Sequence, residues 1–361
     1  MDRVAFANSL RGVAAVSVVI AHYLGVYWAA PAAIAQLTGM PPLPAEPAFE
    51  LSLMPYFNFG PFGVGLFFLI SGFVIPFSLA RYSAAGFLVA RVVRLYPTYL
   101  VGFGITILAI YIGSAVAGGR IPFGFEAALI HSIIGLRDVL WSQHIDGIVW
   151  TLETEIKFYL LCALAAVWFR AGSLNVFLIP IAAFAVVLAL RDPSFHNSTR
   201  WLFLALHAPY LIFMFIGVAA HYLYRGLIHL KLFTVIVAAL IAMFVASLFI
   251  GLFDMRHMVS SYLAAIAIFF ACMRLPAIAT KIPLSSFFAE ISYPLYVVHG
   301  VAGYVVMNLF RLAGMDALIA IVATTILACG VAVLLHKCVE APSVGIARKL
   351  AESTRPIRQL V

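Results

Sequence analysis

Charged residues are scarce in this chain of 361 residues: only 10% are Asp, Glu, Lys or Arg, whereas 65% are hydrophobic. A soluble domain carries about 25% charged residues, so the composition excludes an ordinary soluble protein and predicts a polytopic membrane protein. The alternation of apolar and polar residues that a membrane β-barrel requires is also missing. The spanning segments are therefore expected to be helices, and the fold class to be all-α.

Cysteine is rare as well, and the four cysteines have no paired spacing: Cys162, Cys272, Cys329 and Cys338. They predict small core residues rather than a disulfide framework or a metal site. The sequence has no CxxC, HExxH, Walker or dinucleotide-binding glycine motif, so we expect no metal and no tightly bound cofactor. The net charge of +8 is spread over loops and the C-terminal tail, which favours membrane lipids over nucleic acid as the anionic partner.

About ten apolar segments can be drawn, each long enough to cross a hydrocarbon core of about 30 Å. They are residues 9–30, 60–80, 96–117, 148–168, 174–190, 205–223, 230–251, 258–273, 292–310 and 316–337. The sequence shows no internal repeat, no cleavable signal peptide and no room for a separate soluble domain. We therefore expect one transmembrane domain over residues 1–345 and a basic cytoplasmic tail over 346–361.

The orientation follows from the charge of the connections. Fourteen Lys and Arg residues lie in the termini and in connections 81–95, 169–173, 224–231 and 274–291, against six in the opposite loops. This asymmetry predicts that both termini are cytoplasmic. The long outward connection 31–59 carries Glu46 and Glu50 but no Lys or Arg.

Arg11 and His22 share the first apolar segment. At about 100° and 1.5 Å per helical residue, they lie on nearly the same face, roughly 16 Å apart. Arg11 could be a positive-inside anchor and His22 could bond a neighbouring helix. Ionisable groups at membrane depth are usually functional, however, so the pair favours an anionic substrate held near a buried base.

Arg91 and Arg94 are three residues apart and would face the same way on a helix. Two neighbouring guanidinium groups suit a phosphate or pyrophosphate. The alternative is a topological role combined with lipid headgroup contact.

Three ionisable residues follow one another closely at the start of the fourth apolar segment: Glu153, Glu155 and Lys157. Glu153 precedes Lys157 by four residues, the favourable order for a same-face ion pair. Glu155 lies about 200° round the helix from Glu153 and has no expected local partner. Glu155 is therefore the better candidate for a functional role.

Two further stretches combine small or polar residues with aromatic ones. Ser71 ends a glycine- and phenylalanine-rich segment, which alone indicates close helix packing. Ser292, Tyr293 and His299 open the ninth segment and could be polar contacts between helices.

These features, in this order, resemble the acyltransferase-3 family of bacterial membrane O-acyltransferases. The resemblance runs from Arg11 to Pro342 and rests on six motifs. They are matched by Arg11 and His22; by Phe67, Phe68, Ser71, Gly72 and Phe73; by Arg91, Arg94 and Pro97; by Trp150, Leu152, Glu155, Phe158 and Tyr159; by Ser292, Tyr293, Tyr296 and His299; and by Glu340 and Pro342. The departures are Thr151 in place of the usual serine, and the presence of Glu153 and Lys157. The chain looks like the stand-alone form, without a fused hydrolase-like domain.

The resemblance implies transfer of an acyl group, most often acetyl, from acyl-coenzyme A to a carbohydrate hydroxyl. The acceptor would be an envelope or exported polysaccharide or its lipid-linked precursor, and the location the bacterial inner membrane. Arg11, Arg91 and Arg94 would bind the donor, and His22 would deprotonate the hydroxyl or carry the acyl group. Glu155 would orient or compensate an imidazole, with Ser71, Trp150, Ser292, Tyr293 and His299 as supporting residues.

Two other classes stay open from the residues alone. A transporter or flippase of a sugar-containing substrate would also use buried charges, but it would not need a phosphate clamp beside an Arg/His helix. A scaffolding membrane protein would tolerate the loss of His22. The sequence identifies neither the acceptor, the acyl chain nor the oligomeric state.

Overall fold

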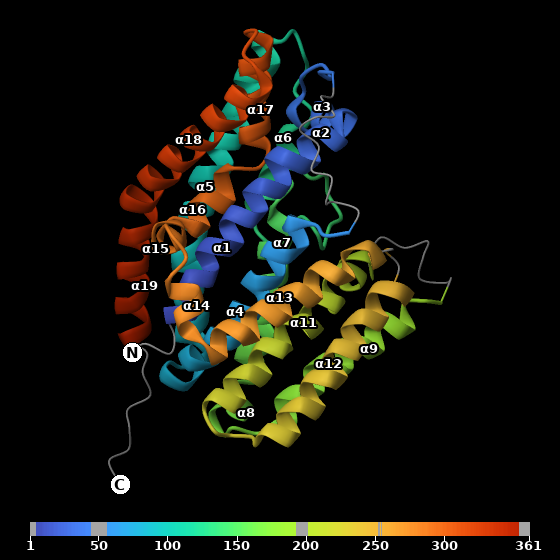
Figure 1. The fold of residues 1–361 in the computed structure, drawn as a ribbon, viewed down its shortest axis with the longest axis vertical. Coiled ribbons are helices and arrows are strands. Elements are labelled where there is room, and N and C mark those ends of the chain that lie inside the picture. Colours follow the sequence, from blue (N-terminus) through green and yellow to red (C-terminus); the bar gives the residue numbers. More distant parts are fainter. Residues whose placement is uncertain (1–4, 45–55, 193–200, 252, 254, 354–361) are drawn as a thin grey trace.

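The computed structural model describes residues 5–44, 56–192, 201–251, 253 and 255–353. Every regular element in these ranges is helical (Figure 1), which confirms the all-α polytopic class. Within the described residues, seven helices are long and apolar enough to cross a membrane, and a bent pair brings the number to eight.

The spanning helices cover most of the predicted apolar segments. They are α1 (Ala5–Ala21) continued by η2 (His22–Val26) and α2 (Tyr27–Ala29), α4 (Phe59–Arg81), α5 (Ala84–Val116), α11 (Leu202–Tyr224), α12 (Leu230–Ile250), η6 (Arg256–Met258) with α13 (Val259–Arg274), and α18 (Ala317–Leu335) continued by η7 (His336–Glu340) and α19 (Ala341–Ser353). The bent pair is α16 (Ser292–Val298) and α17 (Val301–Leu312), which meet at 60°.

Two of the ten predicted segments form helices but differ from the others. Segment 148–168 becomes α7 (Val149–Leu164) and α8 (Ala166–Arg170), and 174–190 becomes η4 (Leu174–Phe177) and α9 (Leu178–Ala189). The helix α7 has 16 residues and three ionisable side chains, and α9 has only 12 residues. Both stretches are shorter than the spans counted above, and α7 also carries three charged side chains. The short connecting helices are α3 (Pro31–Thr38), α6 (Phe125–Ser132), α14 (Pro276–Thr280) and α15 (Ser285–Glu290).

The glycine-rich helix α4 lies at the centre and packs against α1, α11 and α13. A Cβ added at Gly72 would lie 2.0 Å from the carbonyl oxygen of Met214, and one at Gly217 would lie 2.2 Å from that of Leu69. Only glycine allows α4 and α11 to approach this closely. The structural interpretation of this stretch is therefore supported, although Ser71 beside it has a second role described below.

The remaining helices form two groups on either side of α1 and α4 (Figure 1). The helices α9, α11, α12 and α13 make up one group, and α5, α16, α17 and α18 make up the other. The buried hydrophobic residues correspondingly form two clusters. This division leaves the polar side chains of α1, α4, α5 and α7 to meet between the groups.

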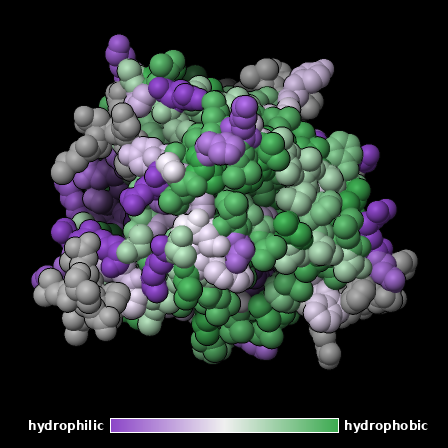
Figure 2. Space-filling view, turned by 90° about the horizontal axis from the view of Figure 1, so that it is seen from below, coloured by the Kyte–Doolittle hydropathy of each residue, from purple (hydrophilic) through white to green (hydrophobic). Residues whose placement is uncertain are grey.

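The start of α1 and the end of α19 lie at the same end of the molecule (Figure 1). Seen from that end, hydrophobic side chains cover broad areas and hydrophilic ones gather in separate groups (Figure 2). The expected boundary between residues 345 and 346 falls inside α19, which packs along α5. Residues 354–361 of the expected tail, and Glu46 and Glu50, lie outside the described residues.

Candidate active site

A cavity of about 380 Å³ lies between α1, α4, α5, α7, α15, α16 and the junction of α18 with α19. Seven of the residues predicted from the sequence line it: Arg11, Ser71, Arg91, Arg94, Glu155, Ser292 and Tyr293. They come from five helices that are distant in the sequence, so the fold brings separate motifs together. The other three predicted residues, His22, Trp150 and His299, lie outside the lining.

Three guanidinium groups face this cavity. Nη2 of Arg91 donates a hydrogen bond of 2.8 Å to the Ser78 hydroxyl, and its guanidinium lies 5.5 Å from the centre of the Tyr159 ring. In the described part of the chain, Arg11 and Arg94 have no hydrogen-bonding or ion-pair partner, and Nε of Arg94 is fully buried. A cation removed from water without a partner is costly, so these groups are suited to an anionic ligand.

Glu155 is the carboxylate that faces the guanidinium groups, and its partners differ from the expectation. The Ser71 hydroxyl from α4 donates to Oε1, and the Tyr159 hydroxyl donates to Oε2 at 3.1 Å. The expectation that Glu155 has no local partner is therefore wrong, because Tyr159 lies four residues further along the same helix face. Two hydroxyl donors fix the carboxylate but leave its negative charge available to the cavity.

Ser292 and Tyr293 line the cavity but direct their hydroxyl groups to backbone carbonyls. Oγ of Ser292 donates to the oxygen of Ala289 at 2.8 Å, and Oη of Tyr293 donates to that of Leu95 at 2.8 Å. The second bond ties α16 to α5 one residue after Arg94. These contacts support a positioning role between helices.

A histidine at the junction of α18 with α19 was missed by the sequence analysis. Nδ1 of His336 lies 2.8 Å from Oε2 of Glu340, and its Nε2 lies 3.4 Å from Oε1 of Glu290. All three side chains line the cavity, and His336 opens the π-helical turn η7. The spacing of four residues between His336 and Glu340 was the signal that could have identified the pair.

The second carboxylate of α7 belongs to a different group, which we call the Asp138 cluster: Arg137, Asp138, Glu153, Lys157 and His207. Arg137 binds Glu153 through two bonds of 2.8 and 2.5 Å, and Lys157 binds Asp138. The expected pairing of Glu153 with Lys157 is therefore wrong: Nζ of Lys157 reaches only the backbone oxygen of Glu153, at 3.4 Å. The segment before α7 folds over the helix and supplies a better partner to each charge.

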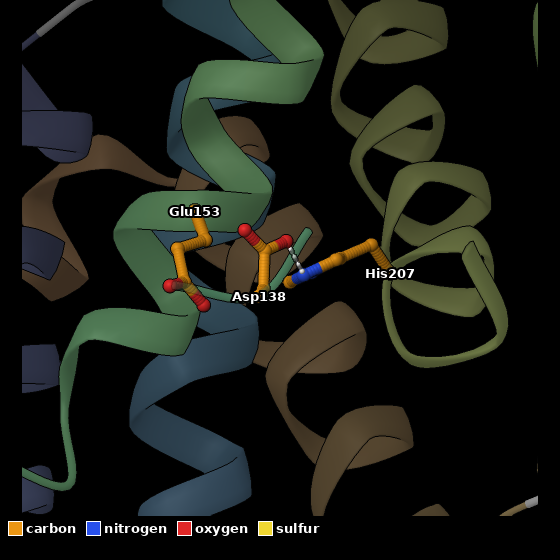
Figure 3. A group of neighbouring side chains, drawn as sticks. All are labelled: Asp138, Glu153 and His207. Carbon is orange, nitrogen blue, oxygen red and sulfur yellow. Dashed lines mark hydrogen bonds and ion pairs between the residues drawn. The ribbon is translucent and has the colours of Figure 1, made fainter. Parts of the chain in front are cut away.

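Asp138, Glu153 and His207 have the side-chain types that bind metals, and their ligand atoms lie within 4.8 Å of one another (Figure 3). Both oxygens of Glu153, however, already bind Arg137, and Oδ2 of Asp138 binds Lys157, so the two negative charges are balanced within the protein. Burial alone would raise the pKa of Asp138, but the bond with His207, 2.7 Å long, and the Lys157 ammonium outweigh burial and lower this pKa to about 2. The cluster has the character of a structural ion-pair network.

His22 begins a π-helical turn, η2, a rare geometry that is frequent at functional sites. Its Nδ1 atom lies 2.7 Å from the hydroxyl of Tyr304, and its ring lies 4.8 Å from the ring of His299. Tyr304 belongs to α17, and no motif of the sequence had singled it out. Arg11 thus lines the cavity, whereas His22 lies behind its wall.

His299 is fully buried at the bend between α16 and α17. Its Nδ1 atom contacts the carbonyl oxygens of Leu295 at 3.0 Å and Tyr296 at 2.8 Å. Tyr296 lines the cavity, and its ring lies 5.5 Å from the His299 ring. One tyrosine therefore separates the cavity from the two imidazoles.

Trp150 packs against aromatic rings rather than facing the cavity. Its ring lies 5.0 Å from that of Tyr210 and 6.4 Å from that of Phe68. Phe68 itself lines the cavity, so Trp150 supports the wall from behind.

Comparison with known proteins agrees with this arrangement of motifs. The family model described as an acyltransferase domain, Acyl_transf_3, matches residues 4–337. Nodulation protein 10 of Rhizobium leguminosarum bv. viciae is 32% identical over a stretch that makes up 32% of this chain and 36% of that protein. The chain thus matches about a third of that bacterial relative's length. No solved structure matches this chain.

The family match covers every helix that lines the cavity except the end of η7 and α19, which follow residue 337. It includes the Arg11 helix, the arginine pair of α5, Glu155 and the imidazoles of His22 and His299. The chain therefore belongs to the acyltransferase-3 family and is a multi-pass membrane acyltransferase.

Proposed function

We propose that this enzyme moves an acetyl group from acetyl-coenzyme A to a hydroxyl of a carbohydrate acceptor. The acceptor is an envelope or exported polysaccharide or its lipid-linked precursor. The observation that carries the proposal is the cavity lined by Arg11, Arg91 and Arg94, two of which have no partner among the described residues, together with Glu155. Planar guanidinium groups suit phosphates, and coenzyme A joins phosphates to a thioester through a long flexible arm.

The size of the cavity is compatible with part of this donor. Its volume of about 380 Å³ lies at the lower end of the range of roughly 300–1,000 Å³ typical of small-molecule sites. The thioester arm occupies the cavity, and the nucleotide end stays at its mouth beside Arg91 and Arg94. Arg11 then contacts the donor deeper along α1.

The reacting centre is the imidazole pair behind Tyr296. One imidazole of this pair handles the proton of the acceptor hydroxyl or carries the acyl group, and a neutral imidazole suits both tasks. Glu155 compensates the positive charge that the arginines and an imidazolium place near the donor. Tyr296 lies between the two regions and must let the acyl group pass.

The acceptor approaches from the opposite end of α1. Beyond His22 the chain continues to Tyr27 and Trp28, and the guanidinium of Arg311 lies 4.8 Å from the centre of the Trp28 ring. The Tyr27 hydroxyl donates to Oδ1 of Asn308 at 2.6 Å. Aromatic rings beside fixed polar groups provide both the apolar face and the hydrogen bonds that a sugar ring needs.

This path requires a definite orientation in the bacterial inner membrane, with both termini cytoplasmic. Reporter fusions after Gly172 should be cytoplasmic, and fusions near Pro42 should be external, because the Lys/Arg imbalance favours that topology. The same compartment for both fusions would contradict the orientation and the donor path with it.

The reaction itself is tested with purified protein in liposomes and acetyl-labelled coenzyme A. The acceptors are a panel of alkyl glucosides, soluble oligosaccharides and extracted envelope glycans. We expect label to move to an ester on at least one of them, with one free thiol released per ester formed. Thiol release without ester, or no reaction with any member of the panel, would overturn the proposed function.

A further inference from the structure

The imidazoles of His22 and His299 differ in which nitrogen holds the proton. Nδ1 of His299 contacts two carbonyl oxygens, of Leu295 and Tyr296, and a carbonyl oxygen can only accept a hydrogen bond. Nδ1 must therefore carry the hydrogen. In a neutral ring this leaves a lone pair on Nε2, which is buried and has no partner among the described residues.

His22 has the opposite arrangement. Its Nδ1 atom lies 2.7 Å from the Tyr304 hydroxyl, and within the described chain that hydroxyl has no other hydrogen-bonding partner. A buried hydroxyl hydrogen needs an acceptor, so Tyr304 donates to Nδ1. A neutral His22 then carries its own hydrogen on Nε2.

The pair thus combines one proton acceptor and one proton donor. The ring centres are 4.8 Å apart and the rings meet edge to face at 63°. A buried polar atom without a partner costs about 1–3 kcal/mol, which makes the bare Nε2 of His299 an expensive feature for a merely structural residue.

We propose that His299 is the catalytic base of the transfer reaction and that the N–H of His22 is a hydrogen-bond donor to the thioester carbonyl, an assignment that rests on the proposed function. Nε2 of His299 takes the proton of the acceptor hydroxyl while its oxygen forms a bond to the thioester carbon. The N–H at Nε2 of His22 donates a hydrogen bond to the thioester carbonyl oxygen as negative charge develops on it. As the carbon–sulfur bond breaks, the protonated Nε2 of His299 gives its proton to the departing thiolate, and both rings are again in their starting forms.

The test compares two nucleophiles in the liposome assay with acetyl-coenzyme A. One is the acceptor with the highest wild-type rate in the panel, and the other is hydroxylamine, which attacks thioesters without a general base; its rate without protein is subtracted. His299→Gln should lose at least about 100-fold in transfer to the alcohol, because that is the usual contribution of a general base. Its protein-dependent transfer to hydroxylamine should fall by less than about tenfold.

The matched control is His221→Gln. His221 is also buried, and its Nδ1 lies 3.0 Å from the backbone oxygen of Phe73, but it lies outside the cavity lining and away from the imidazole pair. This variant should keep both activities. A second variant, His299→Ala, should regain alcohol transfer when imidazole is added, with the regain increasing as pH rises and imidazole becomes neutral.

The outcomes separate the inference from the function on which it rests. Equal losses with both nucleophiles and no rescue by imidazole would show that His299 only supports the fold. Undiminished alcohol transfer by His299→Gln would also overturn the base role. A wild-type protein that acetylates no acceptor would instead overturn the proposed function, and the base role with it.

Discussion

Two carboxylates of α7 lie two residues apart and have opposite electrostatic surroundings. Glu153 is completely buried and belongs to the Asp138 cluster, in which two cations balance two anions. Glu155 faces a cavity with three guanidinium groups, two of them without a partner in the described residues. A region whose charges are paired with one another has little need of a ligand, whereas a cavity with unpaired guanidinium groups is prepared for an anionic one.

The largest expected effect is on the chemistry beyond the cavity. His22→Gln keeps some hydrogen bonding but loses the imidazole beside His299, so it should lower acetyl transfer by at least about 100-fold, and His22→Ala should be as inactive. The matched change in the balanced region is His207→Gln, because His207 is also buried and bound to a hydroxyl and a carboxylate. That variant should retain turnover per folded molecule. Near-normal turnover by His22→Gln in the reconstituted assay would make His22 structural.

The second effect concerns stability, and here the larger loss is expected in the Asp138 cluster rather than at the cavity. Arg137→Met leaves the Glu153 carboxylate buried without its partner, which should cost about 3–5 kcal/mol. Arg94→Met in the cavity removes a cation that has no described partner and should cost far less. Thermal unfolding of both variants in the same detergent measures the difference. A smaller loss for Arg137→Met than for Arg94→Met would show that the balanced region does not hold α7 in place.

The segment that supplies Arg137 also carries a pH-sensitive group, Asp146. Burial raises the pKa of Asp146 from 3.8 to about 6. The backbone N–H groups of Ile148 and Val149, which donate to Oδ1, and the charge of Arg137 oppose this increase. Nε2 of His131 lies 3.6 Å from the same Oδ1 atom. Because this pKa is higher in the folded protein than in the unfolded chain, protonation of Asp146 stabilises the fold. This contribution to the free energy of unfolding is fully present below about pH 4 and is lost as pH rises through 6. The loss should be about 3 kcal/mol.

Asp146→Asn preserves the oxygen that caps α7 and removes the titration. The variant should therefore unfold at a higher temperature than the wild type at pH 7, and the two should converge near pH 4. An unchanged difference across that range would show that Asp146 does not titrate in the folded protein.

The sequence predicted those parts of the molecule that depend on local pattern. Helix α4 follows from its unbroken apolar run, and the cavity residues of five helices were recognised from short motifs. Partners supplied by distant segments could not be predicted. Glu153 pairs with Arg137 because the chain before α7 folds back over the helix, and i,i+4 spacing had favoured Lys157 instead. Tyr304 reaches His22 only through the bend between α16 and α17.

The fourth effect is on the donor. Changing Arg91 and Arg94 together to Ala should weaken binding of coenzyme A by roughly 10–100-fold, since hydrogen bonds to charged groups contribute about 1.5–3 kcal/mol. Added salt should reproduce part of this loss in the wild type and little of it in the variant, because it screens the same attraction. Equilibrium binding of coenzyme A to the purified proteins provides the measurement. Unchanged affinity for coenzyme A would indicate that the two arginines serve only the membrane topology.

The smallest effect tests the comparison on α7 itself. Glu155→Gln keeps the acceptor oxygen for Ser71 or Tyr159 but removes the negative charge that opposes three arginines, so transfer should fall about tenfold, the equivalent of one charged hydrogen bond.

The control removes the whole neighbouring ion pair, Arg137→Met with Glu153→Gln, because the structure pairs these two residues. A buried pair replaced as a unit leaves no uncompensated charge, so this double variant should be more stable than Arg137→Met alone and should keep most of its turnover per folded molecule. If the double variant lost more transfer than Glu155→Gln, the carboxylate that matters for the reaction would be Glu153, and charge balance would be a poor guide to function in this protein.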